Sequence, residues 1–244
     1  MEKIKQYLKK WPWVYTKLQR LYYRCLYYGE KTFLGTRIHE WAWRYFPKFS
    51  IKELQESVKH PHRKYLIKRI EKYSAFGKVL EVGCNAGQNL YLLAKKLPDT
   101  EFYGIDINPQ FIEAGEKWFA NEGLKNVSLS VERADCMDAF QDKSFDVVFT
   151  DAVLMYIGVD KINLVFQEMI RVANKAILLN EWHRESSNLS EHSYWYDFHW
   201  VHDYRLYLQK LLPHDKISIT KLPRGLWGGP GWEEYGSIIE VDLR

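Results

Sequence analysis

One strand-turn-helix segment constrains the fold of this chain more than any other feature. Residues 79–82 (Val-Leu-Glu-Val) form a mostly apolar strand, and residues 83–87 (Gly-Cys-Asn-Ala-Gly) form a turn bounded by two glycines. A helix is predicted to follow from Asn89 to Leu97. Glycine adds no side chain, so such a turn lets the backbone approach a bound nucleoside closely. The segment predicts an α/β fold with a ligand site where its first strand ends.

The rest of the chain from residue 78 onward alternates predicted strands with predicted helices, which is typical of a doubly wound, largely parallel sheet. The predicted helices cover residues 87–97, 108–121, 160–172 and 195–212. The predicted strands cover residues 78–83, 101–106, 127–132, 145–150, 175–180, 217–222 and 237–241. Only a loop rich in Gly, Pro and Trp, residues 223–234, separates the last two strands. We expect that pair to be antiparallel, because a parallel crossover usually contains a helix.

The first part of the chain has a different composition from the rest. Residues 1–48 hold eleven Lys and Arg, three Asp and Glu, and 13 of the 39 aromatic residues. Further helices are predicted at residues 2–28, 36–45, 51–59 and 61–73. We divide the chain into a basic, aromatic-rich helical extension (1–60) and an α/β domain (61–244). Residues 1–48 suit a lid over the site, a surface that contacts anionic membrane lipids, or a surface for nucleic acid or protein.

Cellular location is predicted from what the sequence lacks. Three cysteines, Cys25, Cys84 and Cys136, form no CxxC pair and no plausible disulfide framework. The basic N-terminus has no signal-peptide pattern, and no run of about 18 apolar residues occurs. We expect a cytoplasmic protein, with peripheral contact to the inner membrane face as an option. The sequence carries no signal for an oligomeric state.

Polar groups follow the ends of the first four predicted strands, where an open α/β sheet binds its ligands. Asp106 comes 23 residues after Gly83, where a carboxylate can accept hydrogen bonds from both ribose hydroxyls. Asp135 follows the third strand and can accept from an adenine amino group. Asn85 stands where a third glycine is expected, and Asn tolerates left-handed backbone better than most residues. These groups predict a nucleoside cofactor.

Four segments of the chain resemble class I S-adenosylmethionine-dependent methyltransferases, with domains similar to types 11 and 25. They are residues 81–87, 104–108, 134–136 and 145–149, and the resemblance covers about residues 62–182. It implies a Rossmann-like seven-stranded sheet in the order 3-2-1-4-5-7-6 with strand 7 antiparallel. It also implies S-adenosylmethionine as cofactor and S-adenosylhomocysteine as product. Asn85 departs from the glycine-rich pattern of the turn.

The resemblance also assigns roles to single residues. Glu81 and the turn would hold the methionine part, Asp106 the ribose, and Asp135 the adenine amino group. Ile107 and Cys136 would lie against the adenine ring. The complete predicted cofactor set is Glu81, Gly83, Cys84, Asn85, Ala86, Gly87, Asn89, Asp106, Ile107, Asn108, Ala134, Asp135, Cys136, Thr150 and Asp151.

A dinucleotide-dependent dehydrogenase is the main alternative. A pyrophosphate at a helix N-terminus favours the spacing Gly-x-Gly-x-x-Gly, whereas this chain has Gly-x-x-x-Gly. The carboxylate of Glu81, just before the turn, suits a sulfonium and an ammonium group better than two phosphates. The sequence therefore favours the methyl donor.

Candidate catalytic residues lie after the fourth and fifth strands and in the helix predicted at 195–212. A hydroxyl acceptor would need a base, and Glu181 is a further candidate. On a helix, His199, His202 and Asp203 would share one face. The predicted catalytic set is Asp151, Tyr156, His183, His199 and His202. His183 equally suits a structural role at the end of the fifth strand. No metal site is predicted, and a metal pair of His199 and His202 with Glu181 is the less favoured alternative. His60, His62 and Arg63 suit either a clamp over the cofactor carboxylate or an exposed helix start.

The acceptor is the least constrained part of the prediction. Aromatic residues after the fifth strand suit stacking on a sugar or an apolar ring, or packing in the core. We expect O-methylation of a small-molecule, sugar or lipid-linked acceptor. An RNA or protein methyltransferase and a cofactor-binding module without catalysis stay as alternatives. Nucleic acid is disfavoured, because residues 150–153 (Thr-Asp-Ala-Val) do not resemble the Asn/Asp-Pro-Pro-Tyr pattern of base amino-group methylation.

Overall fold

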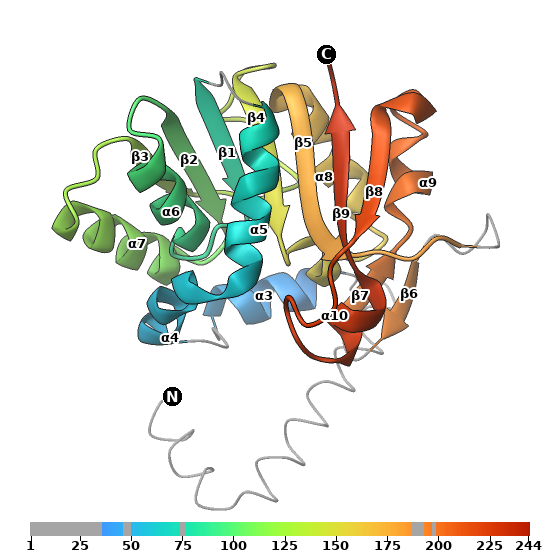
Figure 1. The fold of residues 1–244 in the computed structure, drawn as a ribbon, viewed down its shortest axis with the longest axis horizontal. Helices are drawn as coiled ribbons and strands as arrows, with labels where there is room; N and C mark the ends of the chain where they lie inside the picture. Colours follow the sequence, from blue (N-terminus) through green and yellow to red (C-terminus); the bar gives the residue numbers. More distant parts are fainter. Residues whose placement is uncertain (1–35, 46–49, 74–76, 187–192, 197–198) are drawn as a thin grey trace, which may run out of the picture.

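The structure is a computed structural model that describes residues 36–45, 50–73, 77–186, 193–196 and 199–244 (Figure 1). Within these residues, one seven-stranded sheet has the order β3-β2-β1-β4-β5-β9-β8. Its strands are β1 (Lys78–Val82), β2 (Glu101–Asp106), β3 (Val127–Val131), β4 (Phe145–Asp151), β5 (Ala173–Trp182), β8 (Ile217–Lys221) and β9 (Gly236–Asp242). Strands β1 to β5 are parallel, and β9 is antiparallel to both β5 and β8. The predicted strand order is confirmed, with β8 and β9 as predicted strands six and seven.

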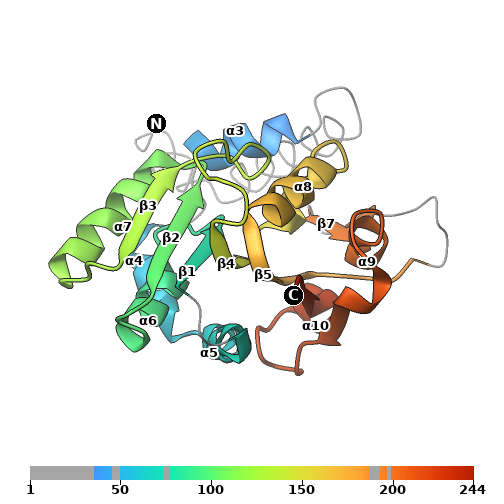
Figure 2. The same cartoon turned by 90° about the horizontal axis from the view of Figure 1, so that it is seen from above.

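Helices cover both faces of the sheet (Figure 2). The helices of one face are α5 (Pro61–Ile70), α6 (Gln88–Lys96) and α7 (Pro109–Asn121), and those of the other are α8 (Ile162–Val172) and α9 (Tyr204–Leu208). A hydrophobic core lies on each face of the sheet, and alternate residues of β1 pack into one or the other. Val79 packs on the face of α5, α6 and α7, and Leu80 packs on the face of α8 and α9. A strand covered on both faces needs a continuous apolar sequence, which explains the predicted pattern.

The carboxyl ends of the parallel strands are covered by the segment that precedes α5. Helix α3 (Arg37–Tyr45) lies beyond the tips of the central strands, and α4 (Ile51–Glu56) lies beside it (Figure 1). Ser50 and Glu53 form a capping box that starts α4. The helices predicted at residues 51–59 and 61–73 each end in a short 3₁₀ turn, Ser57–Lys59 and Glu71–Tyr73. The helix predicted at residues 2–28 lies outside the described residues.

The helix predicted at residues 195–212 is wrong. Strands β6 (Ser193–Tyr196) and β7 (His199–His202) form an antiparallel hairpin instead. Aromatic side chains favour strands, and a hairpin also satisfies the backbone through cross-strand pairs. The helical part is short: Asp203 caps α9 by accepting from the backbone N–H of Leu206 at 3.1 Å. His199 and His202 therefore lie on opposite faces of a strand, and not on one helix face.

The loop predicted at residues 223–234 also contains regular structure. Helix α10 (Pro230–Tyr235) begins after Gly229 and leads directly into β9. Short 3₁₀ turns occur at Leu154–Tyr156 after β4 and at His214–Lys216 before β8. Helix α10 and the turn at Leu154–Tyr156 contact β5, which continues two residues beyond its predicted end to Trp182.

The turn after β1 has the left-handed backbone that its sequence predicts. The φ angles are 76° at Gly83, 51° at Asn85 and 80° at Gly87. A Cβ atom on Gly83 would lie 2.4 Å from Cγ2 of Val153, so the loop after β4 packs directly on the turn. The turn and the loop therefore fit together only if residue 83 has no side chain.

Gly83→Ala and Gly123→Ala make a matched pair that isolates this contact. Both glycines have positive φ, 76° and 69°, but nothing lies within 4 Å of the Cβ position at Gly123. Both variants should lose about 1 kcal/mol through left-handed backbone strain. Gly83→Ala should lose about 1–3 kcal/mol more through overpacking. Urea denaturation of both variants tests this, and equal losses would contradict the packing of Val153 on the turn.

Candidate functional site

An open cleft lies at the carboxyl ends of β1, β2 and β4, beneath α3. Its empty space is about 780 Å³, including its open mouth, which is in the range of small-molecule sites. Six residues of the predicted cofactor set line it: Gly83, Asn85, Asp106, Ile107, Ala134 and Asp135. Helix α3 and the residue before it contribute four lining residues that the sequence prediction did not include: Thr36, His39, Glu40 and Trp43.

Asp106, the last residue of β2, is held in a fixed orientation. Its two carboxylate oxygens accept from the backbone N–H groups of Asn85 and Asn108, each at 2.9 Å. Burial raises the pKa of Asp106 to about 6, against the lowering effect of these hydrogen bonds. Each carboxylate oxygen can still accept a second hydrogen bond. The group is thus arranged to receive two hydroxyls from within the cleft.

Asp135 lies at the other end of the cleft in a cluster of charges. Arg133 donates to its carboxylate at 2.8 Å, and Nζ of Lys161 lies 3.5 Å away. Burial raises the pKa of Asp135, but these two cations outweigh it and the pKa lies below its ordinary value. Both cations also contact Glu40 of α3. Cys136, in contrast, is exposed, with Sγ 3.1 Å from a carboxylate oxygen of Asp138.

Glu81 lies beneath the turn, where it is buried, and it is not among the residues that line the cleft. One oxygen accepts from Nδ2 of Asn89 at 2.7 Å, and the other, Oε2, is buried without a hydrogen-bond partner in the described structure. Burial raises the pKa of this carboxyl well above its usual range. The ammonium group of a methionine moiety would donate a hydrogen bond to this oxygen, so Glu81 fits such a group. Cys84 and Ala86 are buried in the turn itself, and Cys84 packs against Gly104.

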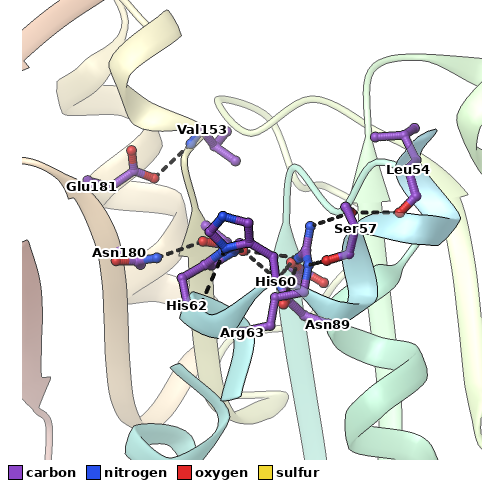
Figure 3. A network of polar contacts seen from close by, with 11 residues as sticks. Leu54, Ser57, His60, His62, Arg63, Asn89, Val153, Asn180 and Glu181 are labelled. Carbon is purple, nitrogen blue, oxygen red and sulfur yellow. Dashed lines mark hydrogen bonds and ion pairs between the residues drawn. The ribbon is translucent and has the colours of Figure 1, made fainter. Parts of the chain in front are cut away.

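Asp151, at the end of β4, is the centre of a buried polar network. Its partners His62, Arg63, Asn89 and Asn180 are labelled in Figure 3. Its Oδ2 lies 3.0 Å from Nε2 of His62 and accepts from Arg63 at 3.2 Å and Asn89 at 2.8 Å. Its Oδ1 accepts from Asn180 at 2.7 Å. Burial raises the pKa of Asp151, but the charges and hydrogen bonds of His62 and Arg63 outweigh it and hold the pKa well below its ordinary value. The carboxylate is thus ionised and fully engaged.

The network joins α5 to the cleft. His62 stacks on Trp227 with ring centroids 3.7 Å apart, and His60 contacts both rings. The sequence left two alternatives for His60, His62 and Arg63, a clamp or an exposed helix start. His62 is buried, so an exposed helix start is wrong for this residue. The contributions of Asn180 and Trp227 had no recognisable signal in the sequence.

Tyr156 connects the cleft to an aromatic wall. It lines the cleft, and its ring centroid lies 4.9 Å from that of Trp43 and 5.0 Å from that of His199. His199 in turn lies 4.8 Å from Trp182 at the end of β5. Tyr196 and Tyr235 complete this wall around Trp182. The structure therefore brings two predicted catalytic residues, Tyr156 and His199, together beside the cleft.

The other predicted catalytic residues lie elsewhere. His202 is fully buried, with Nε2 2.9 Å from the carbonyl oxygen of Ile157, and burial lowers its pKa to about 4. Nδ1 of His183 accepts from the backbone N–H of Tyr204 at 3.3 Å, outside the cleft lining. Glu181 accepts from the backbone N–H of Val153 at 2.9 Å, and burial raises its pKa to about 7.

Thr150 and Asn108, two further residues of the predicted cofactor set, are not among the residues that line the cleft. Thr150 is fully buried in β4, and Asn108 caps α7 and donates to the carbonyl oxygen of Trp43 at 2.7 Å. Among the residues that the structure describes, no three His, Cys, Asp or Glu side chains gather as a metal site would require. The metal pair weighed for His199 and His202 is not supported, because the two side chains leave β7 on opposite faces.

The sheet order and the cleft are those of class I S-adenosylmethionine-dependent methyltransferases, as the sequence predicted. A family model described as a methyltransferase domain matches residues 74–224, and the chain belongs to this family. S-adenosylmethionine is its cofactor, and the protein is a methyltransferase.

Individual known proteins resemble the chain more loosely. It is 26% identical to a demethylmenaquinone methyltransferase of Porphyromonas gingivalis, over 72% of this chain and 71% of that one. It is 29% identical to a sterol 4-C-methyltransferase of Caenorhabditis elegans, over 54% of this chain but only 39% of that one. A methyltransferase structure from Aquifex aeolicus shares the fold, with a TM-score of 0.54 and 19% identity over 80% of this chain and 97% of that one.

Proposed function

We propose that the protein O-methylates a hydroxylated small molecule whose apolar ring or sugar packs on the aromatic wall. The observation that carries this proposal is the contact of Tyr156 with His199 at the edge of the cofactor cleft. A phenol and an imidazole beside apolar rings are suited to orient a hydroxyl and to accept its proton. The two relatives described above are named for a sterol and for demethylmenaquinone, both apolar ring compounds, which supports an apolar acceptor.

The cofactor, when bound, supplies an activated methyl group on a sulfonium. Glu81 would hold the ammonium group through its unpartnered Oε2, Asp106 the ribose hydroxyls, and Asp135 the adenine amino group. His199 would accept the proton of the acceptor hydroxyl as the oxygen of that hydroxyl takes up the methyl group, and S-adenosylhomocysteine would be the product. Tyr156 orients the acceptor, and the surrounding rings exclude water.

The remaining predicted catalytic residues receive positioning roles in this proposal. Asp151 is already engaged at both oxygens, so it fixes Asn89 and through it Glu81. His202 and His183 stabilise the hairpin and its junction with β5. Helix α3 acts as a lid, because its inner residues close the cleft opposite Asp106.

Methyl transfer to defined acceptors tests the proposal. The full chain would be incubated with methyl-labelled S-adenosylmethionine and, separately, with simple phenols, free monosaccharides and prenyl-linked sugars. We expect label on one hydroxylated class, in a linkage that resists mild base as an ether does. Label on RNA or on protein instead would contradict O-methylation of a small molecule.

Tyr156→Phe and His199→Gln test the assigned roles. Each should lower kcat by about 10²-fold, while the Kd for S-adenosylmethionine stays nearly unchanged. His199→Gln should also remove one ionisation from the pH profile of kcat. Matched controls are Tyr103→Phe, on β2 against Glu101, and the exposed His214→Gln. Full turnover in both site variants would place the acceptor elsewhere.

A further inference from the structure

Helix α3 has two faces of different chemistry. The residues that line the cleft, Thr36, His39, Glu40 and Trp43, follow helical spacing on its inner face. The exposed residues, Arg37, Trp41, Arg44 and Tyr45, follow the same spacing on its outer face. Trp41 is 50% exposed and Tyr45 is 54% exposed. The inner face lines the cleft, and the outer face is exposed.

Several polar contacts fix the orientation of α3 on the domain. The hydroxyl of Thr36 donates to Asp160 at 2.5 Å, and the backbone N–H of Thr36 donates to the same carboxylate. Arg133 donates to Glu40 with both terminal nitrogens at 3.0 Å. Such a bidentate pair fixes direction as well as distance. The outward direction of Trp41 and Tyr45 is therefore set by the fold.

The outer face combines aromatic rings, aliphatic surface and positive charge. Trp41 and Tyr45 are neighbours, with ring centroids 6.3 Å apart, and the guanidinium of Arg44 lies 5.9 Å from the Tyr45 ring. Val159, adjacent to Asp160 and thus to the start of α3, is 48% exposed. Trp and Tyr favour the headgroup region of a bilayer, and Arg attracts anionic lipid.

The sequence before α3 has the same chemistry. Residues 1–48 carry eleven basic and three acidic residues with 13 aromatics, whereas the whole chain has a net charge of +4. The remaining 196 residues are therefore net acidic, so positive charge is concentrated at this end of the chain. In the described part of the structure, no helix is long and apolar enough to cross a membrane.

We propose that the outer face of α3, formed by Arg37, Trp41, Arg44 and Tyr45, docks on an anionic lipid surface. Docking there would hold the mouth of the cleft close to the bilayer, because the inner face of the same helix lines the cleft. Nucleic acid fits this face less well, since two guanidiniums on nine residues are few for tracking a phosphate backbone. The proposal concerns binding and does not depend on the identity of the methyl acceptor.

Vesicle sedimentation with the full chain tests the proposal. The vesicles are phosphatidylcholine alone and an equimolar mixture of phosphatidylcholine and phosphatidylglycerol. We expect sedimentation with the mixed vesicles, little with phosphatidylcholine alone, and release by high salt. The Arg37→Ser/Arg44→Ser variant should partition roughly 30-fold less, about fivefold per arginine, and Trp41→Ser/Tyr45→Ser should also release the protein. The control Lys78→Ser/Arg244→Ser removes two exposed cations at the opposite edge of the sheet.

Each result of this experiment decides for or against the proposal. Calorimetric binding of S-adenosylmethionine shows that each variant is folded, and the outer-face variants should retain it. Failure of the full chain to sediment would overturn the proposal. So would unchanged sedimentation of both outer-face variants, or equal loss in the control. Loss of binding to a single-stranded RNA probe, with vesicle binding unchanged, would assign the face to nucleic acid instead.

Discussion

Asp106→Ala is expected to weaken S-adenosylmethionine binding at least about 100-fold, because in the proposed complex it would remove two charge-assisted hydrogen bonds to the ribose. Each is worth about 1.5–3 kcal/mol, and 1.4 kcal/mol corresponds to a tenfold change in Kd. The backbone N–H groups of Asn85 and Asn108 would also lose the acceptor to which they donate. Isothermal titration calorimetry measures the change directly.

Glu101→Ala is the matched control, because Glu101 and Asp106 are the two ends of the same strand. Glu101 is exposed at the amino end of β2, away from the cleft, and its removal should leave the Kd unchanged. If both variants bind the cofactor as the unmodified protein does, Asp106 is not the ribose ligand.

The pH dependence of binding gives a second measure of the same group. The pKa of Asp106 is raised to about 6 by burial, and the ionised carboxylate is the better acceptor. Affinity should therefore be full well above pH 6 and fall about tenfold by about pH 5, as the free carboxyl becomes protonated. Asp106→Asn should remove this pH dependence. An affinity independent of pH over this range would contradict the role of Asp106 as an ionised ribose acceptor.

Asp151→Ala is expected to lower the free energy of unfolding by about 3–5 kcal/mol, because it leaves buried cationic and amide partners without their acceptor. The affected partners are His62, Arg63, Asn89 and Asn180. Urea denaturation measures the loss. Glu113→Ala removes an exposed carboxylate paired with Lys117 on α7 and should change stability little. Similar effects for the two variants would contradict the buried network.

The stabilisation by Asp151 should depend on pH in a defined direction. Its pKa is lower in the folded protein than the value of about 3.9 in an unfolded chain. A carboxyl with a lowered pKa stabilises the fold above the unfolded value and loses this effect as the pH falls. The gap between the unmodified protein and Asp151→Ala should therefore be constant near neutrality and shrink below about pH 4. A gap that widens in acid would contradict an ionised Asp151.

The sheet was predictable because each strand carries a local signal. Apolar runs such as residues 79–82 must be buried on both faces, and the acids that end β1 and β2 mark the ligand edge. The β6–β7 hairpin was not predictable in the same way. Residues 193–203 fit a helical spacing of His199, His202 and Asp203 as well as a strand pattern, and cross-strand pairing decided between them.

The site was predictable only where its residues are close in sequence to strand ends. Asp106 is the last residue of β2, Asp135 comes four residues after the end of β3, and both line the cleft. Two partners of Asp151, His62 and Arg63, come from α5, 89 and 88 residues away in the chain, and Glu40 contacts Arg133 across 93 residues. No local pattern encodes such pairs, because they result from how α3 and α5 pack against the strand ends.

A calorimetric titration of the full chain with S-adenosylmethionine tests the central claim most directly. The cleft lined by Asp106 and Asp135 should bind one molecule of S-adenosylmethionine saturably. S-adenosylhomocysteine should compete for the site, and NAD should not. Absence of saturable binding, or equal competition by NAD, would contradict the assignment of this cleft to a sulfonium cofactor.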